Sequence, residues 1–204
     1  MRLPMFPLGT VLLPGCLLPL HVFEERYRKL FAELEGDRQL FGTCLIERGS
    51  EVGGGDVRFD VGTVARVLMR RDLEDGRLAV VVGGTNRIRV GRWLPDEGYP
   101  IAEVEEFVDI EDVGEDEVEA TRPLVSRVNS IATELGDGNS PIDPHTQGSP
   151  SVRLYHLVDS VPLGVLDRQR LLETERLSDR VRMFRSLLNE LESMLLMKMA
   201  QTDG

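Results

Sequence analysis

The spacing of apolar residues changes near residue 110, and this change limits the folds that the chain can adopt. Before it, apolar and polar residues alternate in short segments such as residues 87–93 and 101–108, which is the period of half-buried strands. After it, apolar residues recur every three or four positions, which is the period of amphipathic helices. Strands followed by helices indicate the α+β class. We expect a β-rich subdomain over residues 1–110 and a helical bundle subdomain over residues 111–204.

Turn residues separate the apolar segments of the first part. Residues 74–76 are acidic and end in glycine, which predicts a hairpin. Residues 27–34 interrupt the strands with a helical spacing, and Gly36 is the expected stop for this inserted helix. Four further segments are predicted strands: residues 3–8, 40–46, 61–69 and 78–82.

The helical part contains one long regular stripe over residues 177–195. Such a stripe suits either the core face of an intramolecular bundle or a coiled-coil seam between two copies, and the neighbouring helices favour the bundle. Homo-oligomerisation therefore stays open as an alternative. Pro123 should kink the helix predicted over residues 118–135 or mark a later start. Residues 137–150 are rich in Gly, Asn, Ser and Pro, which predicts a mobile loop.

Composition excludes several classes of function. The 204 residues carry 24 Lys and Arg against 35 Asp and Glu, a formal charge of −11 that argues against a nucleic-acid binder. Only two residues are lysine, Lys29 and Lys198, and neither stands in a phosphate-binding Gly-Lys-Ser/Thr loop. Cys16 and Cys44 are interpreted as buried thiols of a reducing cytoplasm. No apolar run reaches about 18 residues, so we expect no membrane span.

Catalytic chemistry has no recognisable constellation in this sequence. His21, His145 and His156 are far apart, and no Gly-x-Ser-x-Gly elbow occurs. Neither lysine lies in an apolar context that would lower its pKa for work as a base. The acidic residues over 103–115 are interpreted as a solvated face and linker. We therefore expect no catalytic residue, no cofactor and no metal site.

Several short motifs resemble the N-terminal domain of Lon protease, which is also called the LON substrate-binding domain. Their order and spacing carry the resemblance, which covers nearly the whole chain. The motifs are Phe6-Pro7-Leu8, Leu13-Pro14-Gly15, Leu18-Pro19-Leu20, Val22-Phe23-Glu24-Glu25-Arg26-Tyr27, Phe41-Gly42, Val61-Gly62-Thr63-Val64-Ala65, Asp75-Gly76-Arg77, Gly84, Arg87-Ile88-Arg89-Val90 and Arg168-Gln169-Arg170-Leu171-Leu172-Glu173. The family often has an aromatic residue where Ile88 stands.

The resemblance implies a PUA-like β pseudo-barrel followed by a helical bundle. Lon itself continues into an ATPase module and a Ser–Lys peptidase, so this chain is expected to be a free-standing, non-catalytic form to which a protease label would apply by name only. Most residues of the family motif are expected to be structural, with prolines ending strand pairing at bends and Glu24 complementing a helix start. They are Pro7, Leu8, Pro14, Gly15, Pro19, Leu20, Phe23, Glu24, Arg26, Tyr27, Gly42, Gly62, Gly84 and Arg87.

The resemblance also implies binding of unfolded or exposed hydrophobic polypeptide segments, for quality control or for delivery to a separate protease or ATPase. The predicted contact residues are Leu12, Leu13, Leu17, Leu18 and Tyr27, in and beside a proline-rich segment. The alternative is nucleic-acid binding by a PUA-like fold. Its basic strip would comprise Arg66, Arg70, Arg71, Arg87, Arg89 and Arg92, with Trp93 as the only aromatic partner.

Overall fold

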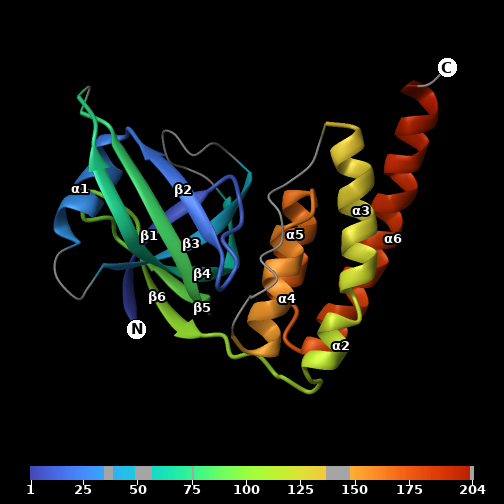
Figure 1. The fold of residues 1–204 in the computed structure, drawn as a ribbon. Coiled ribbons are helices and arrows are strands. Elements are labelled where there is room, and N and C mark those ends of the chain that lie inside the picture. Colours follow the sequence, from blue (N-terminus) through green and yellow to red (C-terminus); the bar gives the residue numbers. More distant parts are fainter. Residues whose placement is uncertain (35–38, 49–56, 75, 137–147, 203–204) are drawn as a thin grey trace. The chain divides into compact units, whose positions relative to one another are not determined.

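A computed structural model of the chain describes residues 1–34, 39–48, 57–74, 76–136 and 148–202. It divides into two compact units, Met1–Val108 and Asp109–Gly204. The first is built of strands with one helix, and the second is built of helices (Figure 1). The α+β class expected from the spacing of apolar residues is therefore confirmed. The predicted loop over residues 137–150 lies outside the described residues up to 147, and Pro150 is the first residue of a helix.

Six strands and one helix form the first unit. They are β1 (Arg2–Leu8), β2 (Leu17–Val22), α1 (Glu25–Glu33), β3 (Leu40–Arg48), β4 (Val57–Asp72), β5 (Leu78–Leu94) and β6 (Ile101–Glu106). The two segments predicted around residues 78–82 and 87–93 are one long strand, β5. Glycines at positions 83 and 84 did not break it because they allow a shift of register and a close backbone approach instead.

The strands close into a pseudo-barrel. The sheet order is β2-β5-β4-β3-β1-β6, and β6 also pairs with β5, so five strands form a ring. β1 and β3 are parallel, while the other pairs are antiparallel. The long strand β5 takes part twice, because its second half pairs with β6 and its first half pairs with β2. β2 is thus attached to the barrel as an edge strand.

The first half of β5 forms a three-stranded extension with β2 and β4. β3 pairs with β4 only as far as Arg66, so the last residues of β4 pair with β5 alone. On the inner side of this extension, Leu20, Val22, Leu78, Val80 and Val82 are buried in a core cluster that α1 completes with Leu30 and Phe31. The alternation of side chains along each strand then places the remaining residues on the opposite side.

The second unit contains five helices in its described residues. They are α2 (Glu115–Glu119), α3 (Arg122–Glu134), α4 (Pro150–Asp159), α5 (Val165–Glu173) and α6 (Leu177–Thr202). Pro123 lies in the first turn of α3, where a missing backbone N–H costs nothing, so of its two predicted effects the later helix start is observed. No described helix is long and apolar enough to cross a membrane.

The stripe predicted over residues 177–195 is the core face of α6. Leu177, Val181, Phe184, Leu188, Leu191 and Leu195 are all buried. α6 packs against α3, α4 and α5, and Figure 1 shows it running alongside α3. This packing is the intramolecular bundle that the neighbouring helices favoured.

Carboxylates attach the start of the second unit to its helices. Asp109 accepts a hydrogen bond from the Arg180 guanidinium at 2.5 Å. Glu111 accepts one from the backbone N–H of Ser151 at 3.0 Å, at the first turn of α4. Asp112 accepts hydrogen bonds from both the backbone N–H and the hydroxyl of Ser178, at the first turn of α6. These acids, interpreted from the sequence as a solvated linker, therefore cap helices and pair with an arginine.

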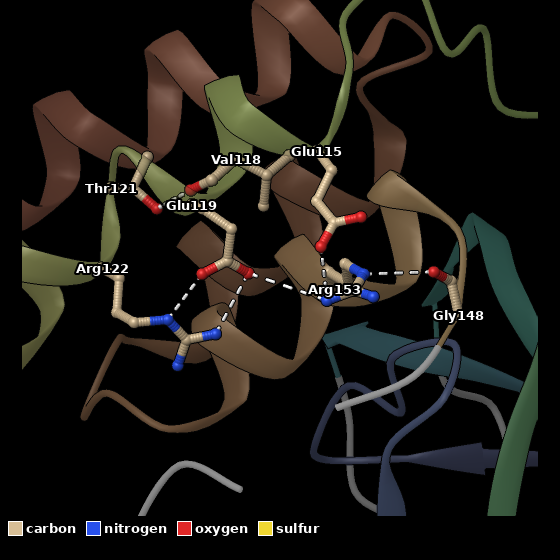
Figure 2. A network of polar contacts seen from close by, with 7 residues as sticks. All are labelled: Glu115, Val118, Glu119, Thr121, Arg122, Gly148 and Arg153. Carbon is tan, nitrogen blue, oxygen red and sulfur yellow. Dashed lines mark hydrogen bonds and ion pairs between the residues drawn. The ribbon is translucent and has the colours of Figure 1, made fainter. Parts of the chain in front are cut away.

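A second polar network links α2 with α3 and α4 (Figure 2). Arg122 donates two hydrogen bonds to Glu119, at 2.6 and 3.1 Å, and Arg153 pairs with Glu115 at 2.9 Å. The hydrogen bonds from Arg122 lower the pKa of Glu119, and the same contact raises the pKa of Arg122. Arg153 also donates to the Gly148 carbonyl at 3.3 Å. Every charged side chain in this network has a partner, as expected for contacts that hold helices together.

Candidate functional site

An apolar surface covers the side of the β2–β5–β4 extension that faces away from the core. We call it the outer face, and it comprises Leu17 and Pro19 of β2, Val81 of β5, and Leu68 and Met69 of β4. The register pairs Pro19 with Val81 and Val81 with Met69, so these three side chains form one row across the sheet. Leu17, Leu68 and Met69 are exposed by 61%, 56% and 65%. Large apolar side chains gathered in this way indicate an interaction surface.

Leu17 and Leu68 meet above Gly83, the next residue of β5 on this side. A β-carbon at Gly83 would lie 3.1 Å from one methyl of Leu68 and 3.7 Å from one methyl of Leu17. The β-bulge between Val67 and Met69 is the reason that Leu68 points outward together with its neighbour. Two consecutive residues of β4 thus contribute to the outer face, which simple alternation does not allow.

A tight turn places Leu17 at the edge of this surface. The backbone N–H of Cys16 donates to the Leu13 carbonyl at 3.1 Å, and Gly15 has φ of 80°. Proline followed by a residue with positive φ is typical of a type II turn, which explains the Pro14-Gly15 pair. The segment before the turn is held against the barrel, because the Thr63 hydroxyl donates to the Leu12 carbonyl at 2.6 Å. The turn therefore separates buried Leu13 from exposed Leu17.

Arginines lie at the two ends of the outer face on β4. Arg66 pairs in register with Gly83, and Arg71 pairs with Ala79, so both share the side that Leu68 and Met69 occupy. Both are exposed, and neither makes a hydrogen bond or ion pair with the described part of the chain. His21, which pairs with Ala79 from β2, is also exposed on this side.

A pocket of about 220 Å³ opens beside the outer face, between α1 and the part of β4 that β3 leaves unpaired. Since one water needs only about 10–15 Å³ of such volume, the pocket has room for an amino-acid side chain. Leu68 and Met69 belong to both the pocket and the outer face, so the two are continuous. The pocket is lined by Phe31, Leu34, Gln39, Val67, Leu68, Met69 and Arg70.

The structure separates the five predicted polypeptide-binding residues. Leu12, Leu13 and Tyr27 are 1–3% exposed, so they are core residues and a ligand cannot reach them in this fold. Leu18 packs partly buried against the same core, and only Leu17 is exposed. The reason is the alternation along β2 together with the anchored turn before it. Sequence reasoning missed Leu68 and Met69, because the bulge that exposes them has no signal in local composition.

The predicted motif residues of the first unit occupy structural positions for the most part. Arg26 pairs with Glu24, the N-cap residue of α1, at 3.0 Å, and it lies over the ring of Tyr27. Pro7 and Pro19 lie inside β1 and β2, so the expectation that they end strand pairing is wrong. β2 is an edge strand among the described strands, and such a strand tolerates proline. Pro7, Leu8, Leu20, Gly42, Gly62 and Arg87 are buried, Gly84 is partly buried, and Phe23 is 55% exposed.

Close approach explains two of the motif glycines. A β-carbon at Gly62 would collide with the Thr43 carbonyl, and one at Gly84 would collide with the Leu13 carbonyl. Both obstacles are backbone atoms that cannot rotate away. These glycines therefore allow neighbouring strands and the segment before β2 to pack closely.

The basic strip of the nucleic-acid alternative is mostly engaged inside the unit. Arg87 is buried over the ring of Phe107, and Arg89 lies over the same ring. Arg70 donates to the Phe31 carbonyl and pairs with Asp72, while Arg92 pairs with Glu103. Arg66 and Arg71 are the two predicted strip residues that have no such contact with described residues. Trp93, the expected stacking partner, is stacked with Arg58 at 4.2 Å.

A second pocket, of about 360 Å³, lies on another side of α1. The Tyr99 hydroxyl donates to Glu33 at 2.6 Å at its rim, and burial together with this acceptor raises the pKa of Tyr99 to about 12. A phenol with so high a pKa is protonated at neutral pH and is a poor general base. Within the described ranges, His, Cys, Asp and Glu side chains form no cluster that could hold a metal ion.

Comparison with known proteins gives a consistent result. The model of the ATP-dependent protease La (LON) substrate-binding domain matches residues 2–190. Lon protease of Cytophaga hutchinsonii is 28% identical over 96% of this chain, and Lon protease of Anaeromyxobacter dehalogenans is 29% identical over 95%. The chain spans about a quarter of the length of these curated relatives (25% and 24%).

Two solved structures have a similar fold. A Lon N-terminal domain protein from Xanthomonas campestris superposes with a TM-score of 0.66 at 28% identity, covering 93% of this chain and 98% of that one. The N-terminal domain of Mycobacterium avium complex Lon protease gives 0.64 at 20% identity and shows likeness of fold alone, over 95% of this chain and 98% of that one.

Proposed function

The chain belongs to the LON substrate-binding domain family, and from this premise we propose that it binds exposed apolar segments of other polypeptides on its outer face. The observation that carries the proposal is the group of Leu17, Leu68 and Met69, each more than half exposed on adjoining strands. Folded proteins rarely leave several large apolar side chains uncovered together unless a partner covers them. Burial of one such leucine contributes about 1–3 kcal/mol to binding.

The shape of the site favours an extended segment. β2 is an edge strand of the described sheet, and the outer face continues from it across β5 and β4. An extended polypeptide can lay alternate side chains on such a surface, and the pocket beside Leu68 and Met69 can take one of them. Sequence-tolerant apolar contacts of this kind suit a module that recognises many polypeptides.

The module is proposed to recognise and not to cleave. The family match is to the substrate-binding domain, and the sequence contains no Gly-x-Ser-x-Gly elbow and no Gly-Lys-Ser/Thr loop. We propose that it works in quality control in the cytoplasm, as an adaptor that passes bound polypeptides to a separate protease or ATPase. This extension rests on the family and on the apolar outer face.

Binding of an unfolded polypeptide tests the proposal. Reduced and carboxymethylated substrate protein, labelled for fluorescence anisotropy, should bind, while the same protein in its native state should not. Leu17→Asp should weaken binding at least about tenfold, since about 1.4 kcal/mol corresponds to a factor of ten. Leu166→Asp is the matched control, because Leu166 is a leucine of α5 with the same exposure, 62% against 61%. Equal losses in the two variants, or binding unchanged by Leu17→Asp, would contradict the outer face as the site.

A further inference from the structure

We infer that the outer face selects apolar segments that carry carboxylates on both sides of their apolar residues. The inference rests on the proposed function and adds a charge requirement to it. Its basis is the position of Arg66 and Arg71, which lie on the outer face at either end of Leu68 and Met69. A ligand that covers the two apolar residues must also meet the two guanidinium groups.

Both arginines lack a partner within the described chain, although acidic residues are abundant. The formal charge of the chain is −11, and two exposed arginines elsewhere in the first unit are paired, Arg2 with Glu97 and Arg92 with Glu103. Arg70 lies between the two in sequence and forms an ion pair with Asp72 at 3.3 Å. Arg70 and Asp72 pair with Val80 and Leu78, whose side chains belong to the core side. Their contact is therefore on the other side of the strand from Arg66 and Arg71.

No acidic residue occupies the outer-face positions of the three strands. The register gives β2 a leucine, a proline and a histidine there, gives β5 an alanine, a valine and a glycine, and gives β4 two apolar residues between two arginines. The side chains of Arg66, Arg71 and His21 are thus the ionisable groups on this surface, and all three are basic. The residues on this side of the three strands, including those at the ends of the outer face, are Leu17, Pro19, His21, Ala79, Val81, Gly83, Arg66, Leu68, Met69 and Arg71.

The geometry sets the spacing of the carboxylates. Arg66 and Arg71 are five positions apart on β4, but the bulge between them leaves their register partners, Gly83 and Ala79, only four positions apart on β5, which at about 3.3 Å per residue is roughly 13 Å. An extended segment lying along β4 would therefore carry its acidic residues four positions apart on one face, with an apolar residue midway between them on the same face. A guanidinium group offers parallel N–H donors that match both oxygens of a carboxylate. An amide side chain gains less from this fork, and a lysine is repelled by it.

Peptides with one apolar centre and different flanks test the inference. Three labelled peptides of the pattern X-Ser-Leu-Ser-X, in which both X residues and the leucine share one face of an extended chain, with X as Glu, Gln or Lys, are compared by fluorescence anisotropy at 0.15 M salt, where charges beyond about 8 Å are screened. The Glu peptide should bind about fivefold more tightly than the Gln peptide, as two exposed ion pairs allow, and the Lys peptide should bind most weakly.

Substitution of the two arginines should remove the preference without removing binding. In Arg66→Gln/Arg71→Gln, the Glu and Gln peptides should bind with equal affinity, and in Arg66→Glu/Arg71→Glu the Lys peptide should bind best. Arg48→Gln is the control, because Arg48 is an exposed arginine of β3 outside the outer face. Thermal denaturation of each variant shows whether it is folded.

The outcomes separate the inference from the function on which it rests. If the three peptides bind the wild-type protein equally well, and Leu17→Asp weakens all of them, the charge requirement is wrong and polypeptide binding stands. If no peptide and no unfolded protein binds, the proposed function fails first. A third outcome is that the wild-type protein binds single-stranded RNA, that Arg66→Gln/Arg71→Gln does not, and that the three peptides do not differ. The two arginines would then be interpreted as phosphate-binding residues instead.

Discussion

Two regions of this protein place side chains at or near the surface, and they differ in how those side chains are used. Around Asp109–Asp112, each of the carboxylates at positions 109, 111 and 112 contacts a helix start or a guanidinium group. On the outer face, Leu17 and Leu68 are uncovered, and the arginines at its ends are unpartnered in the described chain. The first region uses its side chains to hold the fold, whereas the second leaves them available to a ligand.

This difference shows why charge and exposure alone are poor guides to function. Arginine supplies 22 of the 24 basic residues, and many of those described pair with a carboxylate or lie over an aromatic ring. Arg180 is completely buried, donates to the carbonyl of Thr174 and lies over the ring of Tyr155. Arg71, in contrast, makes no such contact with the part of the chain that the structure describes. The two kinds of arginine differ in whether the structure gives the guanidinium group a partner.

The largest effect expected from the comparison is the loss of a structural arginine. Arg180→Ala should lower the free energy of unfolding of the helical unit by about 3 kcal/mol, because it leaves a cavity beside Tyr155 and removes the partner of Asp109. Arg71→Ala should change the stability of the first unit by less than about 0.5 kcal/mol. Urea unfolding followed by helical circular dichroism reports the second unit, and fluorescence of the single tryptophan, Trp93, reports the first. Similar losses in both variants would remove the distinction between the two regions.

A smaller effect separates two adjacent glycines of β5. Gly84→Ala places a methyl group against the Leu13 carbonyl and should destabilise the first unit by about 2 kcal/mol. Gly83→Ala meets only the flexible ends of Leu68 and Leu17, so it should be neutral or stabilise by about 0.5 kcal/mol through the lower entropy of the unfolded chain. Trp93 fluorescence in a urea series measures both changes. A loss of stability in Gly83→Ala as large as in Gly84→Ala would show that the outer face is packed and not open.

Periodicity was sufficient to predict the class of the fold and the core face of α6, because both depend on regular repeats of apolar residues. The family motifs predicted the barrel with its helical bundle. Residues whose position depends on irregular geometry could not be predicted. The bulge at Val67–Met69 turns Leu68 outward, and the type II turn at Pro14-Gly15 leaves Leu13 inside and Leu17 outside. The candidate site was therefore identified from the register of the strands in the structure. Leu17 is the one exposed residue of this site that the sequence predicted, because it lies in the proline-rich segment.

The helix caps at the start of the second unit were missed for a related reason. Seven acidic residues lie between positions 103 and 115, and their density is that of a solvated linker. Only distance in space pairs Glu111 with Ser151, which is 40 residues away, and Asp112 with Ser178, which is 66 residues away. No local pattern reports such long-range capping, since a capping box requires the two residues to lie within one helical turn.

The smallest effect we predict concerns the pH dependence that these caps confer. Burial alone would raise the pKa of Glu111, but hydrogen bonds from Ser149 and Ser151 outweigh it and hold the pKa below its usual value of 4.5. Hydrogen bonds from Ser178 likewise lower the pKa of Asp112 below 3.8. A carboxylate whose pKa is lower in the folded state stabilises the fold fully above its unfolded pKa. That contribution is lost as the pH falls through the folded value.

Glu111→Gln should therefore lower the stability of the helical unit by about 1 kcal/mol at pH 7, the usual value of a helix cap, and by progressively less below pH 4.5. Urea unfolding followed by helical circular dichroism at pH 7, 5, 4 and 3 measures the difference from the wild-type protein. Glu134→Gln, at the exposed end of α3, is the matched control and should be near zero throughout. A difference for Glu111→Gln that stays constant down to pH 3 would mean that its carboxylate does not act through its charge. Stabilisation by Glu111 would then come from hydrogen bonds that its side chain makes in either protonation state.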